Sequence, residues 1–229
     1  MTSAPIRIDP DKLAPEPLDL DPAAFQSPLP VQNYHLVFAD EAIGMAVGIW
    51  DTTTMQEAFG PYPGDEYITV LEGSFSILDA HGNAVTGHAG QSATFRNGIP
   101  VSWKQEGYLR KVYLTLMDPG AGVPRIASAD GGVIVLDGTP SETGGRVVFR
   151  NDAGTMTVEH RVHAGADLPP AATDRHELCR ILSGEMVLTD AEGRLHHFAA
   201  GDHLFLPKGT VVARQTIDGT EAYHVIVGA

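Results

Sequence analysis

The chain has 229 residues, of which 43% are hydrophobic and 19% charged, proportions typical of a globular protein with one large or two small domains. Its net charge of −14 at pH 7 repels phosphate backbones and anionic membrane surfaces, so we expect neither a nucleic-acid nor a membrane partner. Cys179 is the sole cysteine, which excludes an intramolecular disulfide and a thiolate zinc cluster.

The N-terminal segment, residues 1–30, is rich in proline and aspartate and is expected to form an extended arm that packs on the surface or is partly disordered. Its start, "MTSAPIRIDPDK", lacks the basic and apolar regions of a secretory signal. No apolar run in the chain approaches the ~18 residues that a membrane helix needs. These features predict a soluble, cytoplasmic protein.

The rest of the chain is an internal repeat with an offset of 111 residues and no gap. For example, "LEGSFSILDAHGNAV" (71–85) aligns with "LSGEMVLTDAEGRLH" (182–196), and "AGQSATFRNGIPV" (89–101) aligns with "AGDHLFLPKGTVV" (200–212). A register that keeps its glycines over about 80 residues indicates a tandem duplication. We therefore expect two domains, residues 31–120 and 121–229, after the arm.

Each copy is predicted to consist of short antiparallel strands. The segments "DAHG" (79–82) and "DAEG" (190–193) are typical of hairpin turns, and "KVYLTL" (111–116) and "AYHVIV" (222–227) are typical of strands that close each copy. The linker, residues 118–144, contains a further candidate strand in "VIVLD". About eight strands per copy at this spacing predict an all-β fold of two antiparallel barrels or jelly rolls.

The strongest motif is a Glu followed seven residues later by a Gly, and then a Gly-x5-Pro-x-Gly turn. The second copy has all of it, as Glu177, Gly184, Gly201, Pro207 and Gly209, while the first copy has Arg96 in place of the proline. This skeleton resembles the two cupin motifs, so the chain is similar to a bicupin over about residues 31–229. The resemblance implies two barrels that pack as cupin protomers do in a dimer, and it leaves open whether the whole chain forms a homodimer.

A narrower resemblance is to cupins of the ureidoglycine aminohydrolase type. It rests on "YPGDEYITVLEG" (62–73), on Trp103 and on "LRKVYLTL" (109–116). That family acts on small nitrogenous metabolites through a bound metal, held by a rearranged ligand set that includes histidines near the first motif. In this chain His176 alone lies close to such a motif.

The resemblance also implies where a cupin metal site would lie. Three histidines would accompany each motif glutamate, at positions within Phe59–Tyr62 and at Val101 in the first copy, and within Pro170–Thr173 and at Val212 in the second. None of these residues is a histidine, and one carboxylate cannot hold a transition metal alone. We therefore predict no metal cofactor. The alternative is an atypical site for Mn, Fe, Ni or Zn built from Glu177, His160, His203 and His224.

The two motif glutamates, Glu66 and Glu177, are the candidate catalytic or ligand-binding carboxylates, and the alternative is that each is a relict paired with a buried cation. The resemblance surrounds Glu66 with the other predicted ligand-binding residues of the first copy, which are Tyr62, Trp103, Lys111 and Tyr113. In the second copy His224, on the closing strand, is the predicted ligand-binding partner of Glu177. Trp103 can equally be a core residue, with Arg110 or Lys111 as the counter-ion of Glu66. Cys179 shares a strand face with Glu177 and is predicted to be a small buried residue.

Three functions agree with this pattern. The first, which we favour, is a protein that binds a small organic molecule in a barrel without the usual metal site. The second is a metal-dependent enzyme related to ureidoglycine aminohydrolase that uses an atypical ligand set. The third is a metal-free acid/base isomerase or epimerase that uses Glu66 or Glu177. Fold alone cannot distinguish them, because cupins carry many activities.

Overall fold

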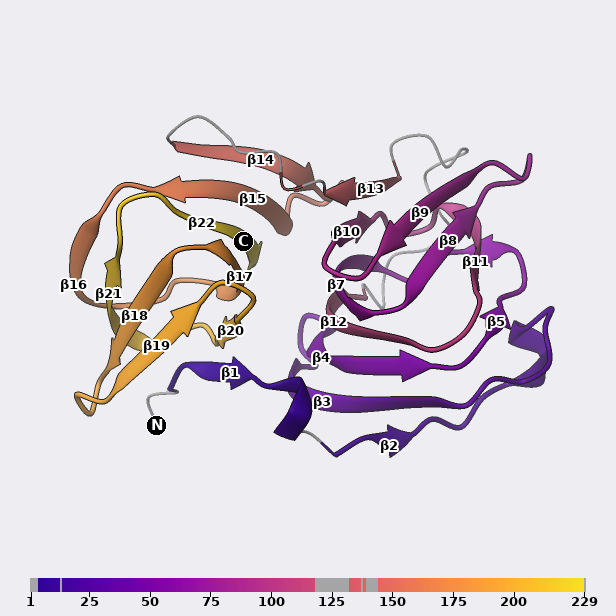
Figure 1. The fold of residues 1–229 in the computed structure, drawn as a ribbon, viewed down its shortest axis with the longest axis horizontal. Coiled ribbons are helices and arrows are strands. Elements are labelled where there is room, and N and C mark those ends of the chain that lie inside the picture. The colour runs from indigo at the N-terminus through magenta and orange to yellow at the C-terminus, as the bar shows by residue number, and fades with distance from the viewer. Residues whose placement is uncertain (1–3, 13, 118–131, 137, 139–143, 229) are drawn as a thin grey trace. The chain divides into compact units, whose positions relative to one another are not determined.

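The computed structural model describes residues 4–12, 14–117, 132–136, 138 and 144–228. They form β-strands and two short 3-10 helices, η1 (Pro10–Lys12) and η2 (Pro22–Ala24). The chain divides into two compact units (Figure 1). The first unit is Lys12–Asp137, and the second unit is Gly138–Ala229 together with Met1–Asp11. Within the described part of the chain, no helix is long and apolar enough to cross a membrane.

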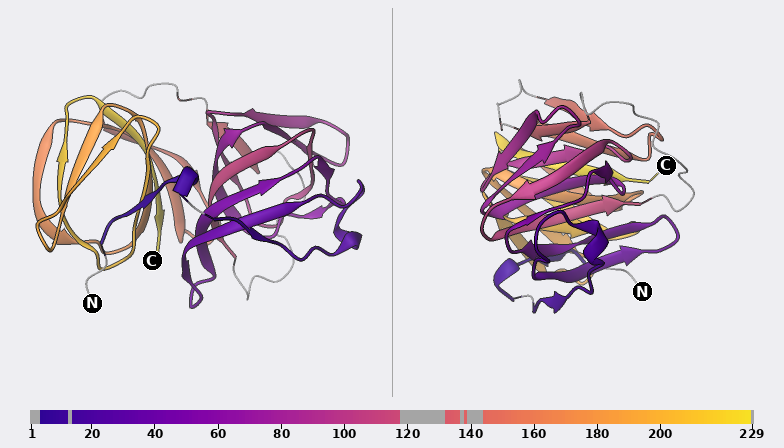
Figure 2. Two further views of the ribbon diagram at one scale, coloured as in Figure 1. Left: turned by 60° about the horizontal axis from the view of Figure 1, so that its bottom comes forward. Right: turned by 90° about the vertical axis from the view of Figure 1, so that its right-hand side faces the viewer.

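The first unit contains two antiparallel sheets that enclose a common interior (Figure 2). One has the order β13-β10-β7-β12-β4-β3-β2, and the other has the order β5-β11-β8-β9, with β6 paired to β11. The strands are β2 (Glu16–Pro17), β3 (Gln32–Asp40), β4 (Met45–Thr52), β5 (Met55–Gln56), β6 (Gly60–Pro61), β7 (Asp65–Glu72), β8 (Ser74–Leu78), β9 (Ala84–His88), β10 (Ser92–Phe95), β11 (Pro100–Gln105), β12 (Leu109–Leu116) and β13 (Val133–Leu136).

The second unit repeats this design with the sheets β1-β20-β17-β22-β15-β14 and β16-β21-β18-β19. The strands are β1 (Ile6–Ile8), β14 (Gly144–Arg150), β15 (Met156–His163), β16 (Ala166–Ala172), β17 (His176–Ser183), β18 (Glu185–Asp190), β19 (Leu195–Ala199), β20 (His203–Leu206), β21 (Val211–Thr216) and β22 (Thr220–Val227). Strands β4, β7, β10, β11 and β12 correspond to β15, β17, β20, β21 and β22 at the same offset of 111 residues. The duplication therefore extends from the sequence to the strand register.

The outer strands of the two units differ from the expected domain boundaries. Strand β13, which the sequence analysis assigned to the second domain, pairs with β10 of the first unit. Strand β1, expected to be part of an extended arm, pairs with β20 of the second unit. The strand before the first copy, β1, thus completes the second unit, and the strand before the second copy, β13, completes the first unit. The expected boundary between residues 120 and 121 lies outside the described residues.

The hairpin turns predicted from the Asp/Gly segments are confirmed. The Asp79 carboxylate accepts hydrogen bonds from the backbone N–H groups of His81 and Asn83 between β8 and β9, and Gly82 has a φ of 82°. Asp190 accepts from two backbone N–H groups between β18 and β19 in the same way, and Gly193 has a φ of 79°. The aspartate closes the turn and the glycine supplies the left-handed conformation, so each strand pair forms in a fixed register.

The motif glycines have a structural reason. Gly73 and Gly184 follow β7 and β17 with φ values of 78° and 77°. A Cβ atom at Gly73 would lie 2.2 Å from the carbonyl oxygen of Tyr108, and one at Gly184 would lie 2.9 Å from the Cα of Thr220. Since only glycine fits this conformation and this approach, the Glu-x6-Gly spacing fixes each motif glutamate at a set distance from a sharp bend.

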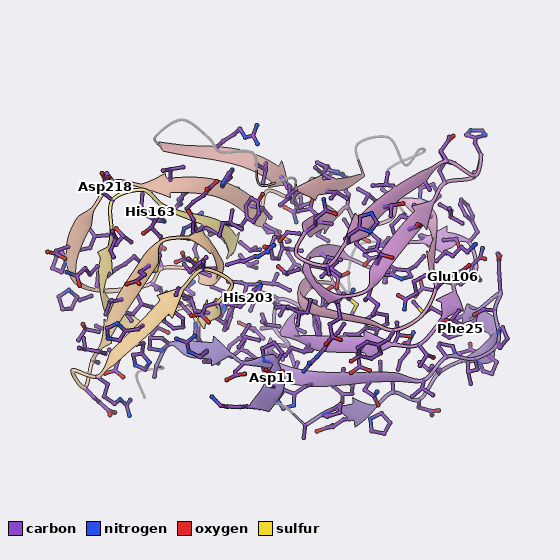
Figure 3. All side chains as sticks on the ribbon, in the orientation of Figure 1. Asp11, Phe25, Glu106, His163, His203 and Asp218 are labelled. Carbon is purple, nitrogen blue, oxygen red and sulfur yellow. The ribbon has the colours of Figure 1, made fainter. Side chains whose placement is uncertain are left out.

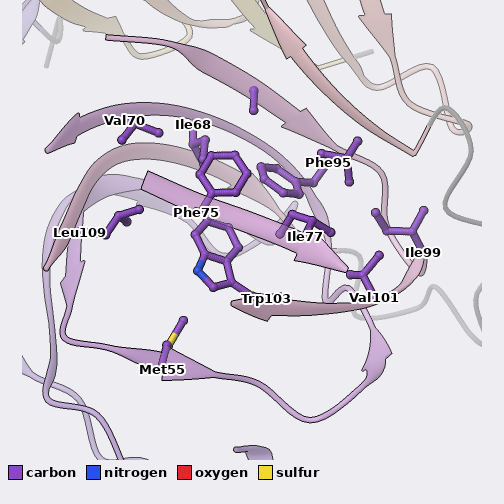
Figure 4. Packing of buried hydrophobic residues seen from close by; sticks show 12 residues of the cluster. Met55, Ile68, Val70, Phe75, Ile77, Phe95, Ile99, Val101, Trp103 and Leu109 are labelled. Carbon is purple, nitrogen blue, oxygen red and sulfur yellow. The ribbon is translucent and has the colours of Figure 1, made fainter. Parts of the chain in front are cut away.

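The interiors of the two units are filled differently. The first is rich in aromatic rings, with Phe75 stacked on Trp103 at 4.7 Å between ring centroids (Figure 4). Tyr62 also stacks on Phe95, at 4.8 Å between ring centroids. The second is filled mostly by aliphatic residues, together with Cys179 and one aromatic residue, Phe198. The aromatic packing of the first unit places indole and phenol rings around its motif glutamate.

Candidate functional site

In the first unit the motif glutamate is buried in an ion pair. Glu66 on β7 faces the barrel interior, and its Oε1 accepts a hydrogen bond from Nζ of Lys111 on β12 at 3.0 Å. Both side chains are 8% exposed. The Tyr62 hydroxyl donates to Oε2 of the same carboxylate. Glu66 is therefore neutralised and hydrogen-bonded through both oxygens by the chain itself.

The sequence left open whether Arg110 or Lys111 was the counter-ion, and the structure assigns Lys111. Lys111 alternates with Leu109 and Tyr113, which pack in the core of this barrel, so all three point to the inner face of β12. Arg110 points the other way and pairs with Glu72 at 3.8 Å. The register of β12 with β7 shifts at this point, while its register with β4 is unbroken.

Two indole rings flank the Lys111 ammonium. Its Nζ lies 4.9 Å from the ring centroid of Trp50 and 4.8 Å from that of Trp103, and the two indoles are in a T-shaped arrangement at 6.1 Å. The Trp103 Nε1–H donates to the Gln105 side chain at 3.0 Å. Trp103 is thus a buried core residue whose ring also contacts the Lys111 ammonium. The sequence analysis had treated a core position and a position beside Glu66 as alternatives, and Trp103 has both. Cation–π attraction adds to the ion pair.

Glu57, which the sequence analysis missed, is a second carboxyl beside this pair. It follows β5 and is held through its backbone, whose N–H donates to the Trp103 carbonyl at 2.8 Å and whose carbonyl accepts from the Ser102 hydroxyl at 2.7 Å. Its side chain is half-buried, and among the described residues no hydrogen bond to its carboxyl is found. Its oxygens are not among the fully buried atoms that lack a partner, so solvent reaches them. Burial and the neighbouring Glu66 raise the pKa of Glu57 to about 7, against the opposing effect of Lys111.

Two tyrosines complete the first site. Burial, followed by the charge of Glu66, raises the pKa of Tyr62 well above its usual value and that of Tyr113 to about 12. Both phenols are therefore protonated hydrogen-bond donors at neutral pH. Tyr113 on β12 lies over Gly48 of β4, where a Cβ atom would be 2.8 Å from the phenol oxygen. The absence of a side chain at position 48 makes room for this ring.

The second unit satisfies its glutamate differently. Glu177 on β17 accepts hydrogen bonds from Arg214 on β21, at 2.9 Å for Nη2 to Oε2 and 3.4 Å for Nη1 to Oε1. Its Oε1 is also 2.5 Å from Nδ1 of His224 on β22. Burial alone raises the pKa of the Glu177 carboxyl, but Arg214 and His224 outweigh it and the pKa is lowered. Glu177 is therefore ionised at neutral pH.

A second histidine extends this cluster. Nε2 of His224 lies 2.9 Å from Nε2 of His163 on β15. Burial lowers the pKa of both rings, that of His163 to about 4, and the charge of Glu177 opposes this effect. Since the ionised Glu177 accepts the Nδ1–H of neutral His224, the Nε2 of His224 accepts a hydrogen bond from the Nε2–H of His163. The four side chains form one chain of hydrogen bonds, from Arg214 through Glu177 and His224 to His163.

Comparison with known proteins decides the family. The sequence matches the EutQ-like cupin domain over residues 41–113 and 170–224, which is more than half of the chain. The chain belongs to the EutQ-like cupin domain family. A search of curated proteins found no match.

Solved structures agree with a cupin fold. A protein of unknown function from Pseudomonas syringae pv. tomato has a TM-score of 0.74 at 18% identity, covering 97% of this chain and 99% of that one. A cupin 2 conserved barrel domain protein from Leptotrichia buccalis has a TM-score of 0.61 at 12% identity, covering 100% and 98%. The protein YlbA from E. coli has a TM-score of 0.60 at 12% identity, covering 97% and 90%. At these identities the likeness concerns the fold, which is two tandem cupin barrels.

The two cupin barrels neutralise the same glutamate from different strands. At the offset of 111 residues, Lys111 corresponds to Ala222, and Trp103 corresponds to Arg214. The cation has thus moved from the closing strand of the first cupin barrel to the preceding strand of the second. Arg214, the other residue that sequence reasoning missed, could have been found by reading the position of Trp103 in both copies.

The histidines proposed for an atypical metal site do not converge. His224 contacts Glu177, but His160 is on the other face of its sheet, where its Nε2 lies 2.5 Å from Glu221 and its ring contacts Tyr223. His203 lies apart from His163 (Figure 3). Burial and Arg180 lower the pKa of His203 to about 3. Adjacent strand residues alternate between faces, which separates these donors.

A cupin metal does not fit the residues present. In the first barrel Gly60 pairs with Val101, and in the second Ala171 pairs with Val212, so the ligand positions of metal-binding cupins are adjacent but carry no imidazole. Among the described residues, no group of three His, Cys, Asp or Glu side chains can hold a metal ion. Both motif glutamates are already paired with a cation of the protein. We therefore derive no chemistry through a metal at these positions.

Cys179 lies beside Glu177 on the inner face of β17, as predicted. It is 1% exposed and packs with the aliphatic core of the second barrel. Burial, followed by the charge of Glu177, raises the pKa of its thiol. A thiol that stays protonated in an apolar core is a packing residue and not a nucleophile.

Proposed function

We propose that the first cupin barrel binds a small organic molecule beside the Glu66–Lys111 pair, without a transition metal. The observation that carries this proposal is Glu57. Its side chain is half-buried beside a pair that is already neutral, and among the described residues no hydrogen bond to its carboxyl is found. The oxygens of Glu57 are not among the fully buried polar atoms that lack a partner, so solvent or a ligand can reach them. A half-buried carboxyl whose pKa is raised by burial is typical of ligand-binding and catalytic sites.

The surroundings of Glu57 support a ligand site. Binding sites for small molecules combine aromatic walls with a few convergent polar groups. Trp50, Tyr62 and Tyr113 are partly buried rings packed against the core of this barrel. The Tyr62 hydroxyl already donates to Glu66, and the protonated Tyr113 phenol is a further donor. The resemblance to ureidoglycine aminohydrolase-type cupins makes ureides and similar small nitrogenous compounds the first candidates for this ligand.

Metal-free acid/base chemistry is the second candidate, and the same residue favours it. A general acid or base works best when its pKa is near the operating pH, and the pKa of Glu57 is raised to about 7. The sequence analysis assigned this role to Glu66 or Glu177, but both are held in ion pairs. Glu57 is the carboxyl that is free to exchange a proton with a bound substrate.

Tryptophan fluorescence provides a direct test, because the chain has two tryptophans and both flank Lys111. In a screen of ureides, small amines and organic acids, we expect a ligand that changes the emission saturably. Replacing Glu57→Gln should weaken its binding about tenfold or more, as expected for the loss of a charged hydrogen bond. Glu106→Gln is the matched control, because that side chain is 84% exposed.

Two outcomes would contradict the proposal. Equal affinity in wild type and Glu57→Gln would remove Glu57 from the site. A ligand whose binding is lost in His163→Gln but kept in Glu57→Gln would move the function to the second barrel.

A further inference from the structure

The charges of the first barrel are not balanced. Glu66 and Lys111 neutralise each other at 3.0 Å, and Tyr62 donates to the remaining carboxylate oxygen. The backbone N–H of Glu57 donates to the Trp103 carbonyl at 2.8 Å, and the Trp103 ring lies 4.8 Å from the Lys111 ammonium, so Glu57 is beside this pair. Both Glu66 and Lys111 act on the Glu57 carboxyl, and Lys111 is the one cation among the described residues that does so. Within the described part of the barrel, the site therefore has two carboxyls and one ammonium. In the second barrel, by contrast, Glu177 and Arg214 balance each other and two neutral histidines complete the cluster.

We propose that the ligand of the first barrel carries a positively charged nitrogen group, an ammonium, amidinium or guanidinium, which pairs with the carboxylate of Glu57. This inference rests on the function proposed above and adds the chemical class of the ligand. The incoming cation supplies the charge that the barrel lacks, so that the occupied site has two carboxylates and two cations.

The aromatic surroundings favour the same class. A cation is attracted to the faces of indole and phenol rings, and Lys111 already occupies such a position between Trp50 and Trp103. Phe25 forms an isolated bridge with Glu57 and is packed, partly buried, against the same core as Tyr62. A second cation at Glu57 would therefore be bordered by rings as well as by carboxylates.

Ligands of the other charge types fit less well. An anion would approach two carboxyl groups, and the one ammonium nearby is already committed to Glu66. A neutral ligand with a carbonyl group can accept a hydrogen bond from Glu57, but only while Glu57 is protonated. The direction of the pH dependence therefore distinguishes a cationic ligand from a neutral one.

The groups that act on Glu57 come from three elements. They are Lys111 of β12, Glu66 of β7 and the phenol of Tyr62, which lies just before β7. On the neighbouring strand β11, Lys104 is 4.0 Å from Glu106. The pKa of Glu57 is raised to about 7, so Glu57 titrates between pH 6 and pH 8. The pKa of the Tyr62 phenol is raised well above that interval.

The test compares three probes of similar size by tryptophan fluorescence: methylguanidinium, neutral N-methylurea and anionic propionate. We expect methylguanidinium to bind most tightly and its affinity to rise about tenfold from pH 6 to pH 8, because binding requires ionised Glu57. Binding below pH 7 should release a proton, which calorimetry in buffers of different ionisation enthalpy measures. Glu57→Gln should abolish both the preference and the pH dependence, and Glu106→Gln should keep both.

The outcomes separate the ligand class from the site. Tighter binding of N-methylurea or propionate that is weakened by Glu57→Gln would overturn the cationic class and leave the proposed site in place. Affinity for methylguanidinium that falls with rising pH, or that is unchanged in Glu57→Gln, would also overturn it. Failure of all three probes to bind would overturn the inference, and the proposed function would then be decided by its own screen.

Discussion

Replacing Lys111→Met should lower the free energy of unfolding by about 3–5 kcal/mol, because it leaves the Glu66 carboxylate buried without a counter-ion. Methionine keeps much of the lysine stem, so the loss reports the charge and not a cavity. Urea denaturation followed by tryptophan emission measures it, since both tryptophans are in the first barrel and contact Lys111. The control is Lys104→Met, whose side chain is 44% exposed and whose effect should stay below about 1 kcal/mol.

The double variant Glu66→Gln/Lys111→Met distinguishes the penalty of the unpaired charge from the value of the pair. Removing both charges should restore most of the stability, since a buried pair contributes little more than a neutral replacement. A single variant as stable as the control would show that Glu66 does not depend on Lys111, and the first site as described here would be wrong.

Replacing Arg214→Met should destabilise the second barrel by about 3 kcal/mol near neutral pH, for the same reason. Glu177 loses its bidentate partner and keeps the hydrogen bond from His224. Circular dichroism during urea unfolding measures the loss, because this barrel has no tryptophan. Arg175→Met is the matched control, with a side chain that is 47% exposed and 4.0 Å from Asp174.

This variant should also change the response to acid. The lowered pKa of Glu177 contributes stability that is fully present above its ordinary value of 4.5 and is lost as the pH falls below it. Without Arg214 the pKa of Glu177 moves back up, so the variant should lose less stability than wild type between pH 5 and pH 3. An equally steep loss in both proteins would mean that Arg214 does not hold the pKa of Glu177 down.

The fold could be predicted from the sequence because its turns and bends are fixed by residues close together in the chain. Asp79 and Gly82 fix one hairpin, Asp190 and Gly193 fix its copy, and Gly73 and Gly184 tolerate no other residue. The exchange of β1 and β13 could not be predicted in this way. Each is a strand of three or four residues whose sequence does not specify which sheet it joins.

The site was predicted in part. Tyr62, Glu66, Trp103, Lys111 and Tyr113 are brought together as expected, because they occupy motif positions on neighbouring inner faces. The choice between Arg110 and Lys111 follows from alternation along β12, because Lys111 shares its inner face with Tyr113.

The residues that sequence reasoning missed lie outside the motif. Glu57 precedes Glu66 by nine residues in an irregular segment, and its importance comes from contacts that only the folded barrel makes. Arg214 carried a signal in the repeat, since a cation stands where the first copy has tryptophan. His160 and His203 were grouped by type, and the alternation of strand faces separated them from Glu177.

The two barrels have diverged since their duplication in a way that bears on function. In the second barrel Glu177 is paired with Arg214 and hydrogen-bonded to His224. The first retains a carboxyl in excess, which stability alone does not explain. This contrast is the reason to look for the ligand in the first barrel.

The metal content of the untagged protein tests the central claim most directly, which is that protein cations take the place of a cupin metal at Glu66 and Glu177. The protein is incubated with Mn, Fe, Ni or Zn, dialysed and analysed by plasma mass spectrometry, beside the double variant Glu66→Gln/Glu177→Gln. We predict that neither protein retains metal at a stoichiometric level, because Lys111 and Arg214 already pair with the two carboxylates. Near-stoichiometric metal in the wild type that is lost in the double variant would contradict the account.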